Sequence, residues 1–65
     1  MRFLINGEMQ ESRAETLAGL LTELDYGEAK VATAVNGAFV AAGERNNRHL
    51  VEGDAIEILA PMQGG

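Results

Sequence analysis

Residues 31–40, VATAVNGAFV, contain one of the two Asn-Gly pairs on which the expected fold depends. Asn36-Gly37 fits a type I′ turn, in which both central residues have positive φ, and this turn commonly closes a β-hairpin. Before the turn, β-branched residues alternate with alanines, which is the pattern of a strand with one buried face. We therefore predict a β-hairpin with its turn at Asn36-Gly37.

A similar pattern opens the chain, in the stretch RFLINGEMQESR. Its Asn6-Gly7 pair predicts a second hairpin, with strands near residues 2–6 and 8–13.

Between the two hairpins, the apolar period changes to that of a helix. Thr16 is the expected N-cap, and Gly27 is expected just past the C-terminal end. Gly19, inside this helix, costs about 1 kcal/mol relative to alanine. The helix presents one apolar face, because its leucines fall at i, i+3, i+4 and i+7: Leu17, Leu20, Leu21 and Leu24.

Residues 41–54 are polar and predict irregular structure, with Leu50 as the anchor to the core. The sequence AIEILA then predicts a last strand over residues 55–60. Pro61 ends this strand, because proline cannot donate a hydrogen bond to the sheet.

The predicted order is therefore hairpin, helix, hairpin, irregular segment and final strand. One helix covers only one face of a sheet, and the helical connection permits parallel pairing of the first and last strands. We predict the α+β class with the β-grasp (ubiquitin-like) architecture, a mixed sheet of four to five strands packed on one main helix. Residues 1–60 form this domain, and residues 61–65 form a flexible C-terminal tail that ends in Gly-Gly. The expected core comprises Phe3, Ile5, Leu17, Leu20, Leu21, Leu24, Val31, Val35, Leu50, Ile56 and Ile58.

The chain of 65 residues carries ten acidic and five basic side chains, which gives a net charge of -5. This charge repels nucleic acid and favours a partner with a basic docking surface. No apolar run reaches membrane-spanning length, and the opening MRFLINGEM lacks the apolar stretch of a secretory signal. We therefore expect a cytoplasmic protein that binds neither nucleic acid nor membranes.

Side chains for catalysis or metal binding are scarce. The chain has no cysteine and a single histidine, His49, so it lacks a thiolate nucleophile and the ligands of a zinc site. The acidic pairs Glu57 with Asp54 and Glu8 with Glu11 have no predicted cleft in which general acid–base catalysis could work. We expect a protein that is not itself an enzyme and that binds no cofactor or metal.

The chain ends in APMQGG, and Gly64 and Gly65 follow the predicted last strand by a few positions. Because these glycines lack side chains, the terminal carboxylate can enter a slot too narrow for other residues. ATP can convert a carboxylate into an acyl-adenylate, which a sulfur or nitrogen nucleophile then attacks. After a β-grasp domain, this ending indicates that the Gly65 carboxylate is the reacting group.

Taken in order, these stretches resemble the ThiS family of sulfur-carrier proteins nearly end to end. The matching segments are FLINGE, TLAGLLTEL, VATAVNGAFV, EGDAIEIL and APMQGG. The resemblance implies that a ThiF-type adenylyltransferase uses ATP to adenylate Gly65, and that a relay from a cysteine desulfurase supplies sulfur for a thiocarboxylate there. A ThiG-type thiazole synthase would then take this sulfur into the thiazole ring of thiamine.

Two leucines, Leu4 and Leu59, alternate with core-facing residues and are expected on the uncovered face of the sheet. A tight turn at Asn6-Gly7 would place Met9 opposite Leu4. A contiguous apolar patch leading to the tail would mark a docking site. The residues expected to bind partners are therefore Leu4, Leu59, Met62, Gln63 and Gly64.

One loop departs from the family pattern, in which a proline, an arginine and a tryptophan are frequent after the second hairpin. Ala41, Ala42 and Arg45 stand at these positions, so the resemblance gives no basis for assigning the family's partner contacts to this loop.

Three other functions share the predicted fold and ending. They are a MoaD-like small subunit of molybdopterin synthase, a ubiquitin-like modifier joined through Gly65 to a lysine, and an inert β-grasp domain. MoaD-like chains tend to have an extended helical section before the last strand, so the compact segment GERNNRHLVEGD favours the ThiS family.

Overall fold

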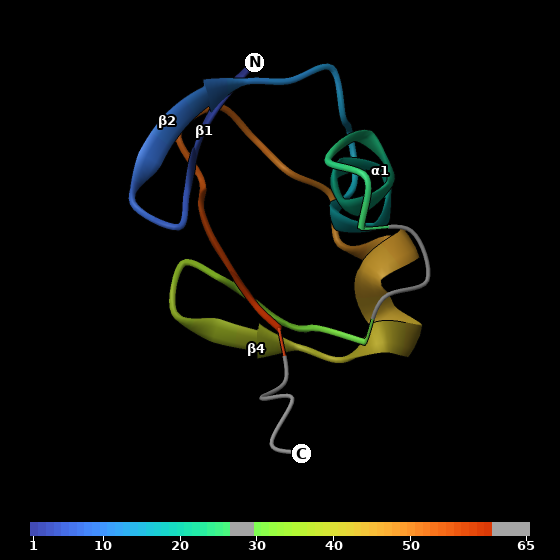
Figure 1. Cartoon of the computed structure of the whole chain (residues 1–65). Helices are drawn as coiled ribbons and strands as arrows, with labels where there is room; N and C mark the ends of the chain where they lie inside the picture. The colour runs from blue at the N-terminus through green and yellow to red at the C-terminus, as the bar shows by residue number, and fades with distance from the viewer. Residues whose placement is uncertain (27–29, 61–65) are drawn as a thin grey trace.

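The computed structural model describes residues 1–26 and 30–60. Its elements follow in the predicted order, with one short 3-10 helix, η1, before the last strand (Figure 1). They are β1 (Arg2–Ile5), β2 (Glu8–Glu11), α1 (Leu17–Glu23), β3 (Ala32–Val35), β4 (Ala38–Val40), η1 (Ala42–Asn47) and β5 (Ala55–Leu59).

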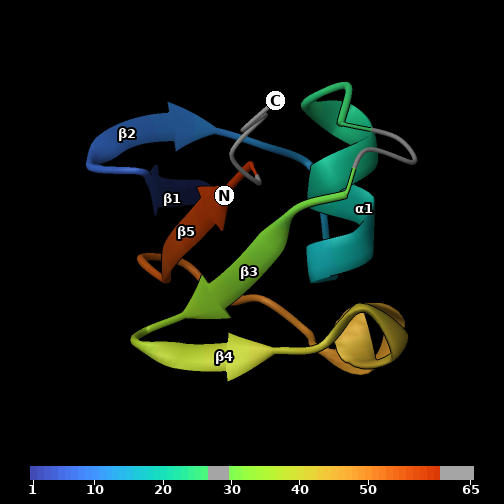
Figure 2. The same cartoon turned by 60° about the horizontal axis from the view of Figure 1, so that its bottom comes forward.

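The strands form one five-stranded mixed sheet in the order β2-β1-β5-β3-β4. β1 and β5 run parallel, whereas β1–β2, β3–β4 and β3–β5 are antiparallel pairs. α1 lies against one face of this sheet, with η1 beside it (Figures 1 and 2). The predicted α+β class and β-grasp architecture are therefore confirmed.

Both hairpins turn on their Asn-Gly pairs, as predicted. The φ values are 49° and 88° at Asn6 and Gly7, and 52° and 85° at Asn36 and Gly37. Positive φ at both central residues is the geometry of the type I′ turn, whose twist matches that of the flanking strands. β2 is shorter than predicted, since it ends at Glu11.

Capping interactions define both ends of α1. At the start, the hydroxyl of Thr16 accepts a hydrogen bond from the backbone N–H of Gly19 at 3.1 Å, which confirms the predicted N-cap. At the end, Asp25 takes the left-handed conformation with φ of 70°, and the N–H of Tyr26 donates back to the helix. Asp25 thus supplies the left-handed residue past the helix, and Gly27 lies outside the described residues.

The core lies between α1 and the covered face of the sheet, and it contains most of the predicted residues. Leu24 and Val31 are only partly buried, because they lie just past the end of α1 and just before the start of β3. Ala14 and Val40 are buried and were not predicted. The buried apolar residues are Phe3, Ile5, Ala14, Leu17, Leu20, Leu21, Val35, Val40, Leu50, Ile56 and Ile58.

The prediction of irregular structure over residues 41–54 is wrong for the six residues of η1. Arg45 fastens this helix to the sheet: its Nε donates to Oγ1 of Thr33 at 3.1 Å, and its Nη2 donates to the carbonyl of Val31 at 2.6 Å. Thr33 is 2% exposed, so the guanidinium reaches a buried partner. Arg45 therefore has a structural role at the position where the family frequently has tryptophan.

Candidate functional site

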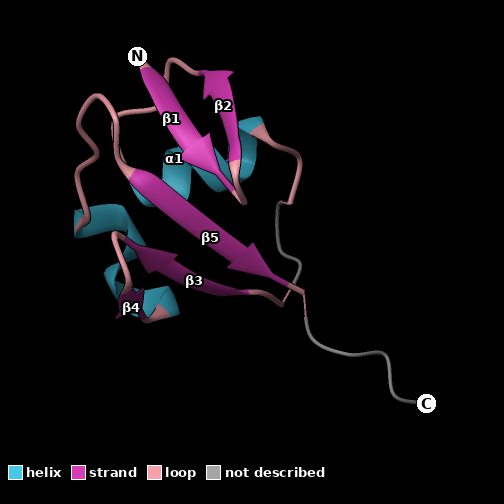
Figure 3. Ribbon diagram, turned by 90° about the vertical axis from the view of Figure 1, so that its left-hand side faces the viewer, coloured by secondary structure: helices cyan, strands magenta, loops and turns pink. Residues whose placement is uncertain are grey.

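The C-terminal strand β5 ends at Leu59, next to the last described residue, Ala60. Leu59 is 64% exposed on the face of the sheet that α1 leaves uncovered, which confirms the outward orientation predicted from alternation. Its partner in the neighbouring strand β3 is Ala32. Figure 3 shows β5 crossing the middle of the sheet to this end. The predicted tail, residues 61–65, therefore begins two positions after the exposed apolar residue Leu59.

Apolar side chains continue from Leu59 across β3 to β4. Leu59, Ala32, Ala34 and Phe39 line one depression of about 100 Å³, together with Glu57. The ring of Phe39 is 73% exposed. We call Ala32, Ala34, Phe39 and Leu59 the root patch, because Leu59 is the last residue of β5 and the predicted tail begins two positions later.

Leu4 lies on the same face but outside the root patch. It is partly buried beside its paired residues, Met9 on β2 and Ala55 on β5, and the pairing with Met9 confirms the expected tight turn. Glu57 lies between Ala55 and Leu59 on this face of β5, and its carboxylate interrupts the apolar surface. Among the described residues, no continuous apolar patch therefore joins Leu4 to Leu59, because the apolar surface beside Leu59 extends toward β4.

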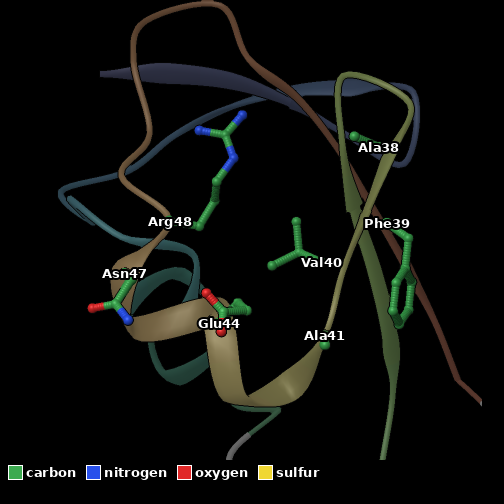
Figure 4. A pocket seen from close by; sticks show the side chains of 7 residues that line it. All are labelled: Ala38, Phe39, Val40, Ala41, Glu44, Asn47 and Arg48. Carbon is green, nitrogen blue, oxygen red and sulfur yellow. The ribbon is translucent and has the colours of Figure 1, made fainter.

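Phe39 is absent from the predicted site residues, although the sequence held a signal for it. The two-residue turn at Asn36-Gly37 pairs Phe39 with Ala34, so both lie on the uncovered face. In Figure 4, the side chain of Val40 points toward η1, whereas the ring of Phe39 lies on the other side of β4. Extending the alternation from β3 to β4 would have found this residue.

A second depression, of about 260 Å³, lies between β4 and η1 (Figure 4). It brings together one acidic and one basic side chain, so it presents no single charge to a ligand. Its described lining residues include none from β5: they are Ala38, Phe39, Val40, Ala41, Glu44, Asn47 and Arg48.

In the part of the chain that the structure describes, candidate acid, base and metal-binding side chains do not converge. His49 is exposed. Asp54 is 6% exposed, and its carboxylate accepts hydrogen bonds at 2.9 Å from the backbone N–H of Val51 and from Nδ2 of Asn36, so it stabilises a turn. Within residues 1–26 and 30–60, His, Asp and Glu form no group of three that could hold a metal ion. The helices in this part of the chain are too short or too polar to cross a membrane.

The predicted tail residues Met62, Gln63, Gly64 and Gly65 lie outside the described residues, as does the boundary predicted at residue 61. Their roles, and the partner-binding roles of Leu4 and Leu59, stay predictions.

Known proteins share both the sequence pattern and this fold. The model of the ThiS family matches residues 3–65, a range that includes the Gly-Gly ending, whereas no curated protein matches the sequence. The crystal structure of the thiamine biosynthesis protein ThiS from Geobacter metallireducens is 29% identical, with a TM-score of 0.83 and coverage of 100% of both chains. A solution structure of a thiamine biosynthesis protein from the same species is 28% identical, with a TM-score of 0.79 and coverage of 100% of this chain and 88% of the other. Because the family model spans nearly the whole sequence, the chain belongs to the ThiS family.

Proposed function

We propose that this chain is a cytoplasmic sulfur-carrier protein of thiamine biosynthesis, and that its reacting group is the carboxylate of Gly65. The observation that carries the proposal is the match of the ThiS family model through residue 65, which includes Gly64 and Gly65. The chain is then a protein co-substrate and not a catalyst. It binds no cofactor of its own, and ATP is bound by the partner adenylyltransferase.

The chemistry requires activation of the carboxylate, because oxide is a poor leaving group. A carboxylate oxygen of Gly65 attacks the α-phosphorus of ATP, and pyrophosphate leaves. A persulfide sulfur, supplied through a cysteine desulfurase, attacks the resulting acyl-adenylate, and AMP leaves. Cleavage of the remaining S–S bond by a thiol reductant releases the thiocarboxylate, from which a ThiG-type thiazole synthase takes the sulfur.

The root patch supports this role as a docking surface for the ThiF-type adenylyltransferase. It places exposed apolar side chains beside the residue from which the tail follows, with Phe39 73% and Leu59 64% exposed. Apolar contacts of this kind hold a partner while the tail enters its active site. We propose that Met62, Gln63 and Gly64 contact the partner along the tail, and that Leu4 lies at the margin of the docked surface.

Intact mass spectrometry tests the proposal directly. The full chain is incubated with ATP, the cognate adenylyltransferase and a sulfur source, and the expected product has gained the mass of one oxygen-for-sulfur exchange at Gly65. Deletion of Gly65 is expected to abolish this gain. Gly43→Ala is the control, because an added Cβ at this position meets no atom within 4 Å and the tail is unchanged.

Two results would contradict the proposal. With a demonstrably active adenylyltransferase, an unchanged mass would exclude the carrier function. A slower-migrating conjugate in place of a thiocarboxylate would indicate a ubiquitin-like modifier.

A further inference from the structure

The end of β5 is held by different groups on its two sides. On the β3 side, strand pairing continues to the last residue of β5, where Leu59 pairs with Ala32. On the β1 side, the last paired residues are Ile5 and Ile56, because β1 then enters its turn. In a strand, the backbone N–H and C=O groups of successive residues point to opposite neighbouring strands. Those of Ile58 therefore point toward the β1 side, at a position where β1 has already ended.

The side chain of Asn6 takes the place of the missing strand. The backbone N–H of Ile58 donates to Oδ1 of Asn6 at 2.8 Å, and Nδ2 of Asn6 donates to the carbonyl of Ile58 at 3.1 Å. The backbone N–H of Asn6 also donates to the carbonyl of Ile56 at 2.9 Å. The carboxamide therefore satisfies both peptide groups of Ile58 and extends the parallel pairing beyond the end of β1.

Asn36, in the other Asn-Gly turn, holds the opposite end of the same strand. Its Oδ1 accepts from the backbone N–H of Ala55 at 2.9 Å, and its Nδ2 donates to Oδ1 of Asp54 at 2.9 Å. Its own N–H donates to the carbonyl of Ala55 at 2.7 Å. The two asparagines thus have the same chemistry and the same turn type, but only Asn6 binds the end from which the tail follows.

We propose that Asn6 is a positioning residue for the reaction at Gly65, an inference that rests on the proposed function. Only Leu59 and Ala60 separate Ile58 from the tail residue Pro61. Once a partner has docked on the root patch, the position and direction of this strand end set how often the carboxylate reaches ATP. Releasing Ile58 from Asn6 lowers the effective concentration of the carboxylate at the reaction site without removing any docking residue.

The test compares Asn6→Gly with Asn36→Gly. Glycine tolerates the positive φ of both positions, so each variant keeps its turn and loses only the carboxamide. We expect Asn6→Gly to lower the rate of adenylation at saturating protein on the order of tenfold, with little change in KM because the root patch is intact. Asn36→Gly is expected to keep the wild-type rate.

Asn6→Asp gives an intermediate case. The aspartate keeps an acceptor for the N–H of Ile58 and lacks the donor to its carbonyl, so the rate should lie between those of wild type and Asn6→Gly. Hydrogen exchange measured by NMR reports on the contact itself: the amide of Ile58 should exchange faster in Asn6→Gly, and that of Ala55 should exchange faster in Asn36→Gly.

The outcomes separate the inference from the function on which it rests. If wild type is adenylated and both glycine variants lose rate equally, Asn6 acts only through general stability. If the Ile58 amide exchanges faster in Asn6→Gly while the rate is unchanged, the contact does not position the tail. A wild-type chain that is not adenylated at all would reject the proposed function, and the inference with it.

Discussion

Arg45 shows how much one side chain contributes when it bridges two elements. Its guanidinium donates to a buried hydroxyl and to a backbone carbonyl on or beside β3, and both acceptors come from residues distant in sequence. The planar guanidinium can serve the two acceptors at once, which the ammonium of a lysine cannot do with the same geometry. Thr33 in turn donates to the carbonyl of Val40 at 2.8 Å, so the bridge extends into β4.

Arg45→Met should therefore lower the free energy of unfolding by about 1–3 kcal/mol, because both hydrogen bonds to a charged donor are lost. Urea denaturation measures the change. Arg48→Met is the matched control, since among the described residues the guanidinium of Arg48 donates to the carbonyl of the adjacent residue His49, at 2.7 Å, and to no other element. We expect the control to change stability by less than about 0.5 kcal/mol. Equal effects of the two substitutions would mean that the bridge to β3 adds no stability.

At the level of the elements, the same substitution should have opposite effects in the helix and in a hairpin turn. In Gly19→Ala, the added Cβ lies 3.4 Å from Oγ1 of Thr16 and 3.8 Å from Cβ of Ala14, which is ordinary contact. Alanine should therefore raise the free energy of unfolding by about 0.5–1 kcal/mol. In Gly7→Ala, the φ of 88° is unfavourable for alanine, and a loss of about 1–2 kcal/mol is expected.

Thermal unfolding of the two variants, compared with wild type, shows whether each substitution raises or lowers the stability. A loss of stability in Gly19→Ala would show that the methyl group disturbs the N-cap, in which Thr16 accepts from this very N–H.

The elements that could be predicted from the sequence are those with local signals. The Asn-Gly pairs specify the type I′ turns, and the leucine spacing specifies α1, because these patterns act within a few residues. η1 could not be predicted, because Arg45 fixes it through contacts with residues 12 and 14 positions away. The end of α1 was missed for a different reason, since Asp25 adopts a conformation that glycine usually provides.

The candidate site, too, could be predicted from the sequence only in part. Strand alternation was sufficient to place Leu59 outward, whereas the direction in which the apolar surface continues depends on strand order. β5 lies between β3 and β1. The apolar surface beside Leu59 extends toward β3, because Ala32 and Ala34 of β3 and Phe39 of β4 lie on that side. The hydrogen bond between Asn6 and β5 could not be predicted either. The Asn-Gly pair indicates a turn, but it gives no sign that the side chain of Asn6 binds Ile58, 52 positions later.

For the molecule as a whole, one face of the sheet packs against the core, and the other is exposed and is the proposed docking face. α1 and the core cover the first face, and the second carries the root patch at the end of β5. Asn6 and Asn36 hold the two ends of β5 from the two hairpins, so side-chain hydrogen bonds fix both ends of the strand that leads to the tail. Under the proposed function, the chain presents one carboxylate to several enzymes, and a rigid body with a defined strand end favours that role.

The proposed docking face predicts that two apolar residues with nearly the same exposed fraction differ in their effect on partner binding, according to where they lie. Leu59 is 64% exposed beside the tail, and Val51 is 62% exposed before the start of β5. Leu59→Ser should weaken binding to the adenylyltransferase by about tenfold, which corresponds to about 1.4 kcal/mol, whereas Val51→Ser should leave the affinity unchanged. Isothermal titration calorimetry measures both, with urea denaturation to establish that each variant is folded. Equal affinities of the two variants would place the docking surface away from the root patch, because a partner seated there has to bury Leu59.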